Sequence, residues 1–350
     1  RDLVGLHATD PTTVHLSAWA RVDGLERATT ERALYDDRTL VRMIGMRRTL
    51  FIEPTDLAPV VHAACVPTIV ARERRRLEGW LVEGGVTPTP ALWVAHLEDA
   101  TVAAIEQLGA ATATELTRLV PELATQIPVS LKGAPAGGIG ASTRILFLLA
   151  MDGRIARGRP RGTWVSSQYR WEPMDRWVPM LEHAGRLSEG SAQAALVGHW
   201  LRTFGPGTTD DLRWWTGLTL GAVRRAIATL ETTEVGLEDG SVGLALTDDL
   251  EPTPSPVSWI ALLPSLDSTT MGWTARDWYL GPHRSALFDR NGNAGPTVWV
   301  DGRVVGGWGQ RPDGEVVTRL LEDVGAESSA AIDARGATLT AWMDGVRIMP

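Results

Sequence analysis

Cysteine and lysine are almost absent from this chain. Its 350 residues contain one cysteine, Cys65, and one lysine, Lys132. A single cysteine excludes a disulfide framework and a multi-cysteine metal site, and we expect Cys65 to be a small buried residue. No run of 18 apolar residues occurs, and the first residues do not resemble a secretory signal, so we expect neither a transmembrane helix nor export. The sequence does not begin with Met, and we expect that a segment precedes it.

The charges are unevenly distributed along the chain. The net charge of −8 by itself argues against a nucleic-acid partner. Residues 38–76, however, hold eight Arg against three acidic residues, and residues 141–170 hold six Arg against one. Residues 231–350 hold 18 acidic residues against eight Arg. Two basic segments ahead of an acidic third are a pattern that indicates nucleic-acid binding, and guanidinium groups match the geometry of phosphates.

An internal repeat with an offset of 96 residues organises the middle of the chain. GAATATEL begins at Gly109 and GPGTTDDL at Gly205, so that Gly, Thr and Leu recur at fixed positions. In each copy the conserved threonine is placed to cap a short helix, and a second helix and a hairpin-like segment follow. This order predicts a winged-helix module in each copy. Two unrelated helical hairpins are the alternative.

The flanks of the repeat complete the predicted organisation. A helix capped by Asp10 and a basic hairpin over 40–52 predict a third, less complete winged helix. The Pro-rich segment 251–257 predicts a linker, beyond which we expect a small β-rich domain with a helix over 313–324 and a last strand at 337–343. The predicted fold class is α+β, with tandem winged-helix modules at 1–56 (incomplete at its start), 109–175 and 176–250, a helical connection at 57–108, and a β-barrel-like domain at 257–350.

The loop GLHATDP, residues 5–11, is the candidate catalytic segment. Asp10 is expected to cap the following helix, and His7 and Thr9, two residues apart, would project the same way from an extended loop. Histidine is suited to general-base work near neutral pH, and Asp10 would orient it or stabilise a cation. In the structural alternative, Asp10 only caps the helix and His7 only packs.

Several segments together resemble the winged-helix DNA-binding family that contains the AlkZ-type and YcaQ-type DNA glycosylases. The family's catalytic motif, Gln-x-Gln or Gln-x-Asp, lies in this loop, and its two positions fall on His7 and Thr9. The resemblance implies cleavage of the N-glycosidic bond of alkylated or cross-linked purines in double-stranded DNA. The segments that carry it are GLHATDPTTVHLSAWAR (5–21), DDRTLVRMIGMRRTLFIEP (36–54), DLRWWTG (211–217), LLPSLDSTTMGW (262–273) and RNGNAGPTVWVDGRVVGGW (290–308).

Arginines in the predicted wings and helices are the candidate DNA contacts. The predicted helix segment at 71–80, with its four arginines, either contacts phosphates or is a solvated face. Three residues of the tail are expected either to border the lesion or to pack in the core. The candidate DNA contacts are Arg47, Arg48, Arg157, Arg159, Arg161, Arg224 and Arg225. The possible lesion residues are Trp273, Arg276 and Asp277.

The sequence therefore predicts a bacterial DNA repair glycosylase with His7, Thr9 and Asp10 as its catalytic residues. No lysine lies near the loop in sequence, so we expect a monofunctional hydrolase without Schiff-base chemistry. We expect a cytoplasmic, nucleoid-associated monomer that needs no metal or cofactor and binds no membrane. Because neither motif glutamine is present, a non-enzymatic winged-helix DNA-binding protein or regulator is the first alternative. A module that kept the fold and lost DNA is the second.

Overall fold

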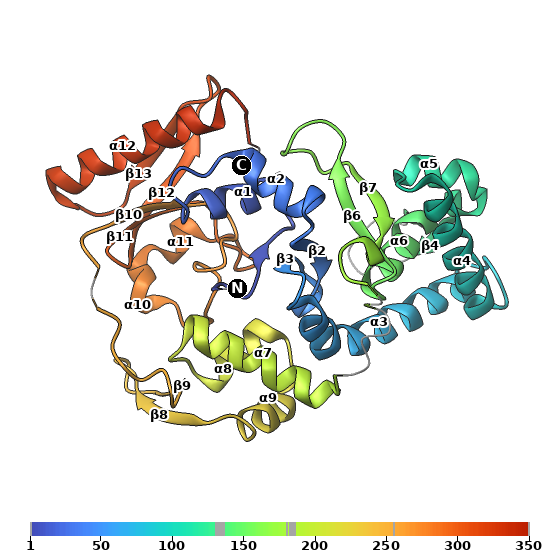
Figure 1. Cartoon of the computed structure of the whole chain (residues 1–350), viewed down its shortest axis with the longest axis horizontal. Coiled ribbons are helices and arrows are strands. Elements are labelled where there is room, and N and C mark those ends of the chain that lie inside the picture. The colour runs from blue at the N-terminus through green and yellow to red at the C-terminus, as the bar shows by residue number, and fades with distance from the viewer. Residues whose placement is uncertain (1, 130–136, 180, 182–186, 255, 349–350) are drawn as a thin grey trace. The chain divides into compact units, whose positions relative to one another are not determined.

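The computed structural model describes residues 2–129, 137–179, 181, 187–254 and 256–348, so that Lys132 lies outside the described residues. The fold is α+β and divides into two compact units, residues 31–196 and residues 2–30 with 197–350. Each unit is built from both helices and strands (Figure 1). This division cuts through the predicted first module, 1–56, because its first helix belongs to one unit and its hairpin to the other.

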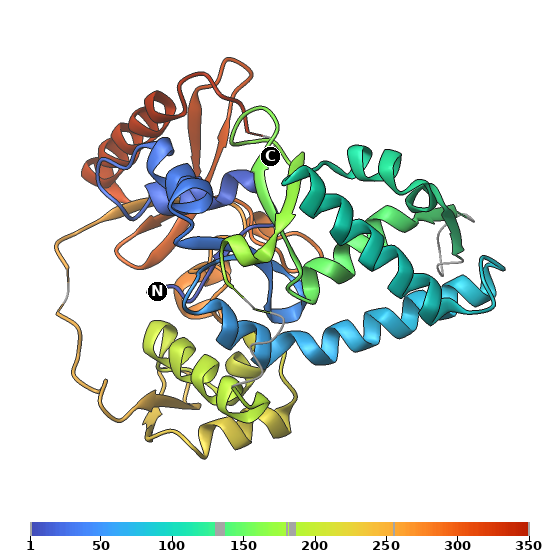
Figure 2. The ribbon, with the colours of Figure 1, turned by 45° about the vertical axis from the view of Figure 1, so that its right-hand side comes forward.

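The first unit is built around one long helix, α3. Helices α4, α5 and α6 gather around the C-terminal half of α3 (Figure 2), and leucines such as Leu77, Leu97 and Leu116 fill the core between them. Its elements are η1 (Arg32–Asp36), β2 (Leu40–Ile44), η2 (Met46–Arg48), β3 (Leu50–Pro54), α3 (Ala58–Glu83), α4 (Pro90–Leu108), α5 (Ala113–Leu119), η3 (Pro121–Ala124), β4 (Gln126–Val129), β5 (Gly137–Gly140), α6 (Ala141–Met151), β6 (Ile155–Pro160), β7 (Tyr169–Pro173), η4 (Met174–Arg176) and the start of α7 (Glu189–Phe204).

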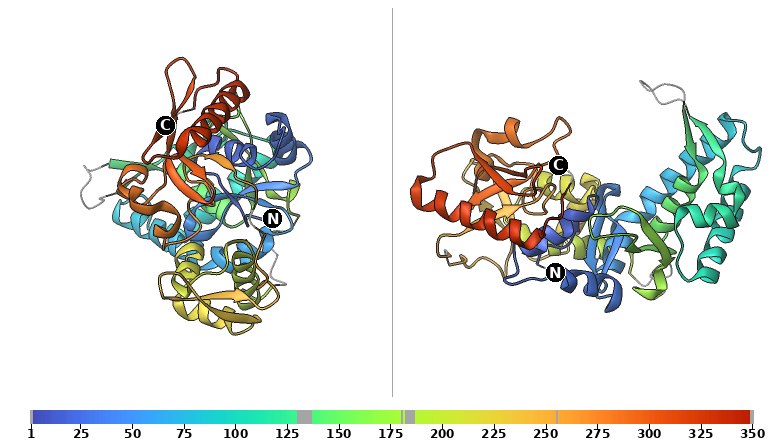
Figure 3. Two further views of the ribbon diagram at one scale, coloured as in Figure 1. Left: turned by 90° about the vertical axis from the view of Figure 1, so that its left-hand side faces the viewer. Right: turned by 90° about the horizontal axis from the view of Figure 1, so that it is seen from above.

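The second unit joins the N-terminal segment to the C-terminal sheet. Leu16 and Trp19 of α1 share a core with Leu262, Val298 and Ile332. Helix α12 runs along the sheet β10-β11-β12-β13 (Figures 1 and 3). Besides the end of α7, its elements are β1 (Leu6–His7), α1 (Pro11–Trp19), α2 (Arg27–Glu31), α8 (Thr209–Thr216), α9 (Leu220–Ile227), β8 (Thr232–Gly236), β9 (Val242–Leu246), β10 (Ile260–Leu263), α10 (Asp277–Leu280), η6 (Gly281–His283), α11 (Arg284–Leu287), β11 (Thr297–Val300), β12 (Arg303–Gln310), β13 (Val316–Leu320) and α12 (Gly325–Met343).

The two repeat copies have the same order of elements. Copy one runs α4, α5, α6, β6, β7, and copy two runs α7, α8, α9, β8, β9. Thr112 and Thr208 cap α5 and α8, and each forms a reciprocal capping box with the residue three positions on, Glu115 or Asp211. Both predicted caps are therefore confirmed. Copy one differs in the extra hairpin β4–β5 between its second and third helices.

The C-terminal region corrects three expectations. Its four described strands form an open antiparallel sheet in the order β10-β11-β12-β13, and not a barrel. Residues 316–320 of the expected helix 313–324 form strand β13. Gly314, with a positive φ of 97°, makes a tight turn, after which Val316 pairs with Gln310 of β12. The β-branched run Val-Val-Thr favours this strand. The expected strand 337–343 is the end of helix α12, whose alanine-rich sequence favours a helix.

Glu53 on β3 is a fully buried carboxyl group. Its side chain is 0% exposed, and neither carboxyl oxygen has a hydrogen-bond partner among the described residues. Burial raises the pKa of Glu53 well above its ordinary value, which favours the neutral form of the group. Cys65 of α3 is also buried, as expected, and burial followed by the influence of Glu53 raises the pKa of its thiol.

We predict that Glu53→Gln stabilises the protein at neutral and higher pH. A carboxyl group whose pKa is raised in the folded state loses stability as pH rises above its unfolded pKa, because only the unfolded chain then ionises. The free energy of unfolding, measured by urea denaturation, should rise by roughly 1 to 3 kcal/mol at pH 8. The difference should disappear near pH 4. The exposed Glu122→Gln variant is the control, and an equal effect in both variants would contradict the assignment.

Candidate catalytic loop and nucleic-acid interface

The predicted catalytic residues lie in consecutive parts of one loop. His7 ends strand β1, and Asp10 caps helix α1 through one carboxylate oxygen, which accepts from the backbone N–H and the hydroxyl of Thr12, both at 2.8 Å. The cap predicted for Asp10 is confirmed. His7 is 8% exposed whereas Thr9 is exposed. This difference in burial does not match the common direction expected for these two side chains.

A buried carboxylate, Asp267, holds this loop and α1 on the C-terminal domain. Asp267 is 0% exposed and accepts from both terminal nitrogens of Arg21, at 2.6 and 2.9 Å. It also accepts from the Ser17 hydroxyl at 2.6 Å. Next to it, the Ser268 hydroxyl donates to the carbonyl oxygen of Gly5 at 2.7 Å. The segment just before the candidate catalytic residues is thereby held by side chains more than 240 positions away.

A second buried carboxylate, Glu73 of α3, collects four guanidinium groups in the first unit. Glu73 is 1% exposed, and Arg48 and Arg144 each approach it at 2.9 Å, with Arg76 at 3.7 Å and Arg72 at 3.9 Å. Burial alone would raise the pKa of Glu73, but the hydrogen bonds from Arg144 and Arg48 outweigh it and lower the pKa. Four positive charges against one negative leave this cluster at +3.

Aromatic rings hold this cluster in place. Arg48 and Arg144 lie over the ring of Phe147, at 5.8 and 5.5 Å from its centroid, and Arg144 also lies over Trp80 at 5.2 Å. Arg144 and Phe147 belong to α6, the third helix of repeat copy one. Sequence reasoning identified Arg48 and the helix segment at 71–80 but missed Arg144. The one sequence signal for Arg144 was its place on a predicted repeat helix within the basic segment 141–170.

The three arginines of the first wing do not form one uniform row. Arg157 lies between the rings of Tyr169 and Trp171, and burial, followed by the nearby Arg42, lowers its pKa. Arg159 pairs with Asp36 at 2.9 Å and Arg161 with Glu115 at 3.0 Å. A bulge between residues 157 and 160 accompanies this divergence. The alternation of these arginines in the sequence predicted three guanidinium groups along one side of the wing. In the structure each of the three has different neighbours.

The remaining candidate DNA contacts differ in their surroundings. Arg47 adopts a positive φ of 53° in the turn between β2 and β3 and is partly exposed. Arg224 and Arg225 are exposed on α9, the third helix of repeat copy two, and neither forms an ion pair within the described part of the chain. Both therefore present their charge to solvent.

Trp273, Arg276 and Asp277 are brought together at a cavity of about 430 Å³ in the second unit. Arg276 is 3% exposed, lies over the rings of Trp214 and Phe288, and donates to two carbonyl oxygens. The three possible lesion residues thus share one cavity, with Arg276 also part of the packing around it. No group of three His, Cys, Asp or Glu suited to a metal occurs within the described ranges.

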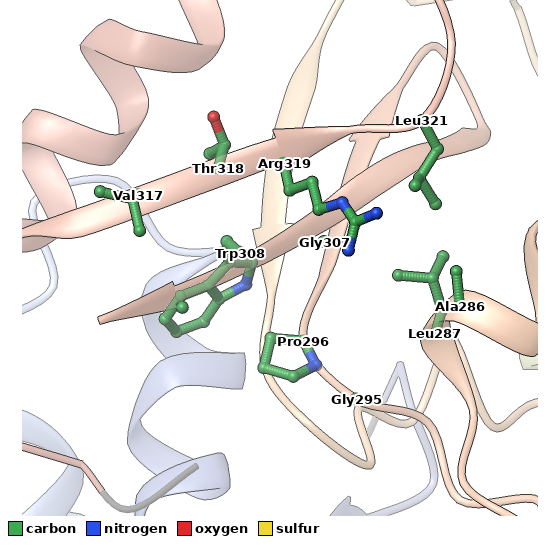
Figure 4. Close-up of a pocket in the computed structure, with 11 residues that line it drawn as sticks. Ala286, Leu287, Gly295, Pro296, Gly307, Trp308, Val317, Thr318, Arg319 and Leu321 are labelled. Carbon is green, nitrogen blue, oxygen red and sulfur yellow. The ribbon is translucent and has the colours of Figure 1, made fainter. Parts of the chain in front are cut away.

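Another cavity, of about 290 Å³, lies on the C-terminal sheet. Figure 4 shows Arg319 of β13 extending between Trp308 and Leu287. The described residues that line it include no histidine and no carboxylate. The cavity therefore offers no group for acid–base chemistry.

In the described part of the chain, no helix has the length and apolar character needed to cross a membrane.

Arginines on the helices and wings of a repeated α+β module are a pattern typical of nucleic-acid-binding proteins. The family model for "DNA glycosylase AlkZ-like" proteins matches residues 1–342, and the chain belongs to this family. The interstrand DNA cross-link repair glycosylase of Streptomyces sahachiroi is 26% identical over 364 residues, which cover 99% of this chain and 90% of that protein. The family expected from the sequence is confirmed.

The fold likeness has the same extent. The solved structure of Streptomyces sahachiroi DNA glycosylase AlkZ matches with a TM-score of 0.68 and 22% identity, covering 100% of this chain and 91% of that one. At this identity the likeness concerns the fold. The order of helices and strands is therefore shared along the whole chain.

We predict that Arg72 and Arg76 carry part of any affinity for duplex DNA. Their double replacement by Gln leaves Glu73 with Arg48 and Arg144, so the fold should be retained. The slope of log K against log salt should become less steep by about 2, since each lost phosphate contact removes about 0.9. Fluorescence anisotropy with an undamaged duplex measures this slope.

Two further variants make the result specific. Replacing Arg159 and Arg161, which already pair with carboxylates, should change the slope less. Arg311→Gln, in the exposed pair with Glu315, should not change it. A slope that stays the same after the Arg72 and Arg76 replacements would show that this cluster faces away from DNA.

Proposed function

We propose that this chain is a monofunctional DNA glycosylase that hydrolyses the N-glycosidic bond of alkylated or cross-linked purines in double-stranded DNA. The observation that carries this proposal is the polar loop His7–Asp10, onto which the sequence resemblance puts the family's catalytic pair. It lies between Gly5, which accepts from Ser268, and α1, which is bonded to Asp267. The curated relative is named for interstrand DNA cross-link repair, which supports the class of lesion.

The chemistry needs little acid assistance. An N7-alkylated purine is already a cation, so the bond between C1′ and N9 breaks with its electron pair going to the base. A positively charged, oxocarbenium-like sugar develops, and water forms the new bond at C1′. In this proposal His7 accepts the proton that the water loses, Thr9 holds that water, and Asp10 stabilises the developing positive charge.

Asp10 has an oxygen to spare for this role. Its Oδ1 is the atom that caps α1, and no hydrogen bond to Oδ2 occurs among the described residues. The carboxylate is only partly buried, so a substrate can reach it. The helix cap fixes the side chain, which gives the second oxygen a defined position.

The same proposal includes the finer architecture. We propose that residues 109–175 and 176–250 are winged-helix modules, because in each a pair of helices, α5 and α6 or α8 and α9, is followed by a two-stranded wing. In both copies a single bridge joins the residue just before the capping threonine, Ala111 or Gly207, to the last strand, β7 or β9. The boundaries 57–108, 109–175, 176–250 and 257–350 are kept as proposals. We further propose that the protein binds DNA as a monomer.

One observation favours a second function. His7 and Thr9 stand where the family pattern has Gln-x-Gln or Gln-x-Asp, and His7 is largely buried. A non-enzymatic DNA-binding protein or regulator would tolerate such changes, because its basic surfaces would be sufficient. Single-turnover excision from a duplex that contains N7-methylguanine distinguishes the two functions.

We predict that Asp10→Asn separates catalysis from capping. Asparagine caps a helix about as well as aspartate but carries no charge. Single-turnover excision should therefore fall by roughly 100-fold, while the free energy of unfolding changes by less than about 0.5 kcal/mol. Asp10→Ala should lose the same activity and also about 1 kcal/mol of stability. Excision that survives Asp10→Asn would remove the electrostatic role.

We predict that His7→Ala lowers the rate of base excision and that His7→Gln, which places the family's glutamine there, loses less. His7→Ala should slow excision by about 100-fold, the usual scale for a positioned base, and Thr9→Ala should slow it less. His7→Gln should retain more activity than His7→Ala, since glutamine can still orient water. The affinity for undamaged duplex should stay the same in all three variants. Equal rates for wild type and His7→Ala would place the base elsewhere.

A further inference from the structure

The cavity beside Trp273 lies between the helices and wing of repeat copy two and the segment 273–278 of the C-terminal part of the chain. It has a volume of about 430 Å³, within the range of small-molecule sites. Asp211 of α8 connects its two sides, because one carboxylate oxygen accepts from the backbone N–H groups of Thr274 and Ala275, at 2.8 and 3.2 Å. The other oxygen accepts from Thr208. The cavity is therefore formed within one unit by fixed backbone contacts.

Its apolar wall is a rigid set of aromatic rings. Trp273 donates its indole N–H to the carbonyl oxygen of Phe204 at 3.0 Å and meets that ring edge-on, with centroids 5.3 Å apart. Trp278 meets Trp273 edge-on at 5.1 Å and Tyr279 at 4.9 Å. Despite these contacts, Trp278 is 60% exposed. An exposed indole held by edge contacts is a preformed surface on which a planar ring can stack.

The polar groups at this cavity are mostly acidic. Glu238 and Asp239, at the tip of the wing β8–β9, and Asp277 are exposed carboxylates. The hydroxyl and backbone N–H of Ser241 lower the pKa of Asp239, so it stays ionised. With buried Asp211 and the single guanidinium of Arg276, four negative charges face one positive, a net of −3.

We propose that this cavity binds a planar, positively charged heteroaromatic ring, the class to which an N7-alkylated purine base belongs. The aromatic wall supplies stacking and cation–π attraction, and the carboxylates select the cation over a neutral ring. A net charge of −3 disfavours DNA phosphates at the same place. None of residues 5–11 lines the cavity, so it is a site separate from the candidate catalytic loop.

The biological ligand in this proposal rests on the glycosylase function proposed above, but the binding site does not. Free nucleosides test the cavity without any excision. At mildly acidic pH, 7-methylguanosine keeps its N1 proton and is a ring cation, whereas guanosine has nearly the same shape and no charge. A protein that binds the first and excises nothing would keep the site and lose the glycosylase function.

The test is calorimetric titration of the full chain with 7-methylguanosine, guanosine and tetramethylammonium. We expect 7-methylguanosine to bind about tenfold more tightly than guanosine, the scale of a cation–π contribution of about 1.4 kcal/mol. Equal binding of the two nucleosides, or no binding of either, would overturn the proposal. Tighter binding of tetramethylammonium would also overturn it, because the site would then select an aliphatic cation.

Variants locate the binding in this cavity. Trp278→Ala should weaken the binding of 7-methylguanosine about tenfold, and Trp278→Phe should restore most of it. Replacing Asp277 by Asn and Glu238 by Gln should weaken binding of the cation but not of guanosine. Trp259→Ala, at a tryptophan that is 37% exposed outside the cavity, is the matched control. A loss with Trp259→Ala as large as that with Trp278→Ala would place the binding elsewhere.

Discussion

The buried carboxylate of Asp267 is the interaction on which the candidate active site depends. It has no contact with water, and it is compensated by the two nitrogens of Arg21, the hydroxyl of Ser17 and the backbone N–H of Thr269. Breaking a buried pair of this kind costs about 3 to 5 kcal/mol, so the arrangement persists only as a whole. Helix α1 and the loop before it are therefore fixed to the C-terminal domain, although they lie at opposite ends of the sequence.

Glu73 is also a buried carboxylate compensated by guanidinium groups, but with a different result. Its carboxylate is as buried as Asp267, but it gathers more guanidiniums than it can neutralise. The surplus charge is exposed on a surface stiffened by Phe147 and Trp80. One carboxylate thus fixes α1 to the C-terminal part of the chain, and the other concentrates positive charge at α3 and α6. This explains how a chain with a net charge of −8 can offer a local surface suited to phosphates.

The negative charge of the C-terminal third favours a different kind of ligand from the arginine cluster. Negative charge would repel a DNA backbone, but beside the exposed ring of Trp278 it favours a cationic ring. An alkylated purine differs from a normal one mainly by that positive charge.

The sequence by itself determined the local elements whose signals are local. The threonine caps, the Asp10 cap and the helix, second helix and hairpin of each repeat copy all follow from neighbouring residues. The family also followed, because its motifs are spread over the whole chain. In the tail, local signals conflicted. The run at 316–320 became a strand only because β12 was there to pair with it.

Tertiary structure alone decided which distant groups meet. Arg21 and Asp267 are 246 positions apart, and Glu73 and Arg144 are 71 apart. Neither pairing leaves a mark in local sequence, since an arginine near a carboxylate in space looks like any other charged residue in the chain. The cavity beside Trp273 likewise combines segments from residue 204 to residue 278. Burial and charge compensation act through space, and a sequence pattern records only what lies within a few turns.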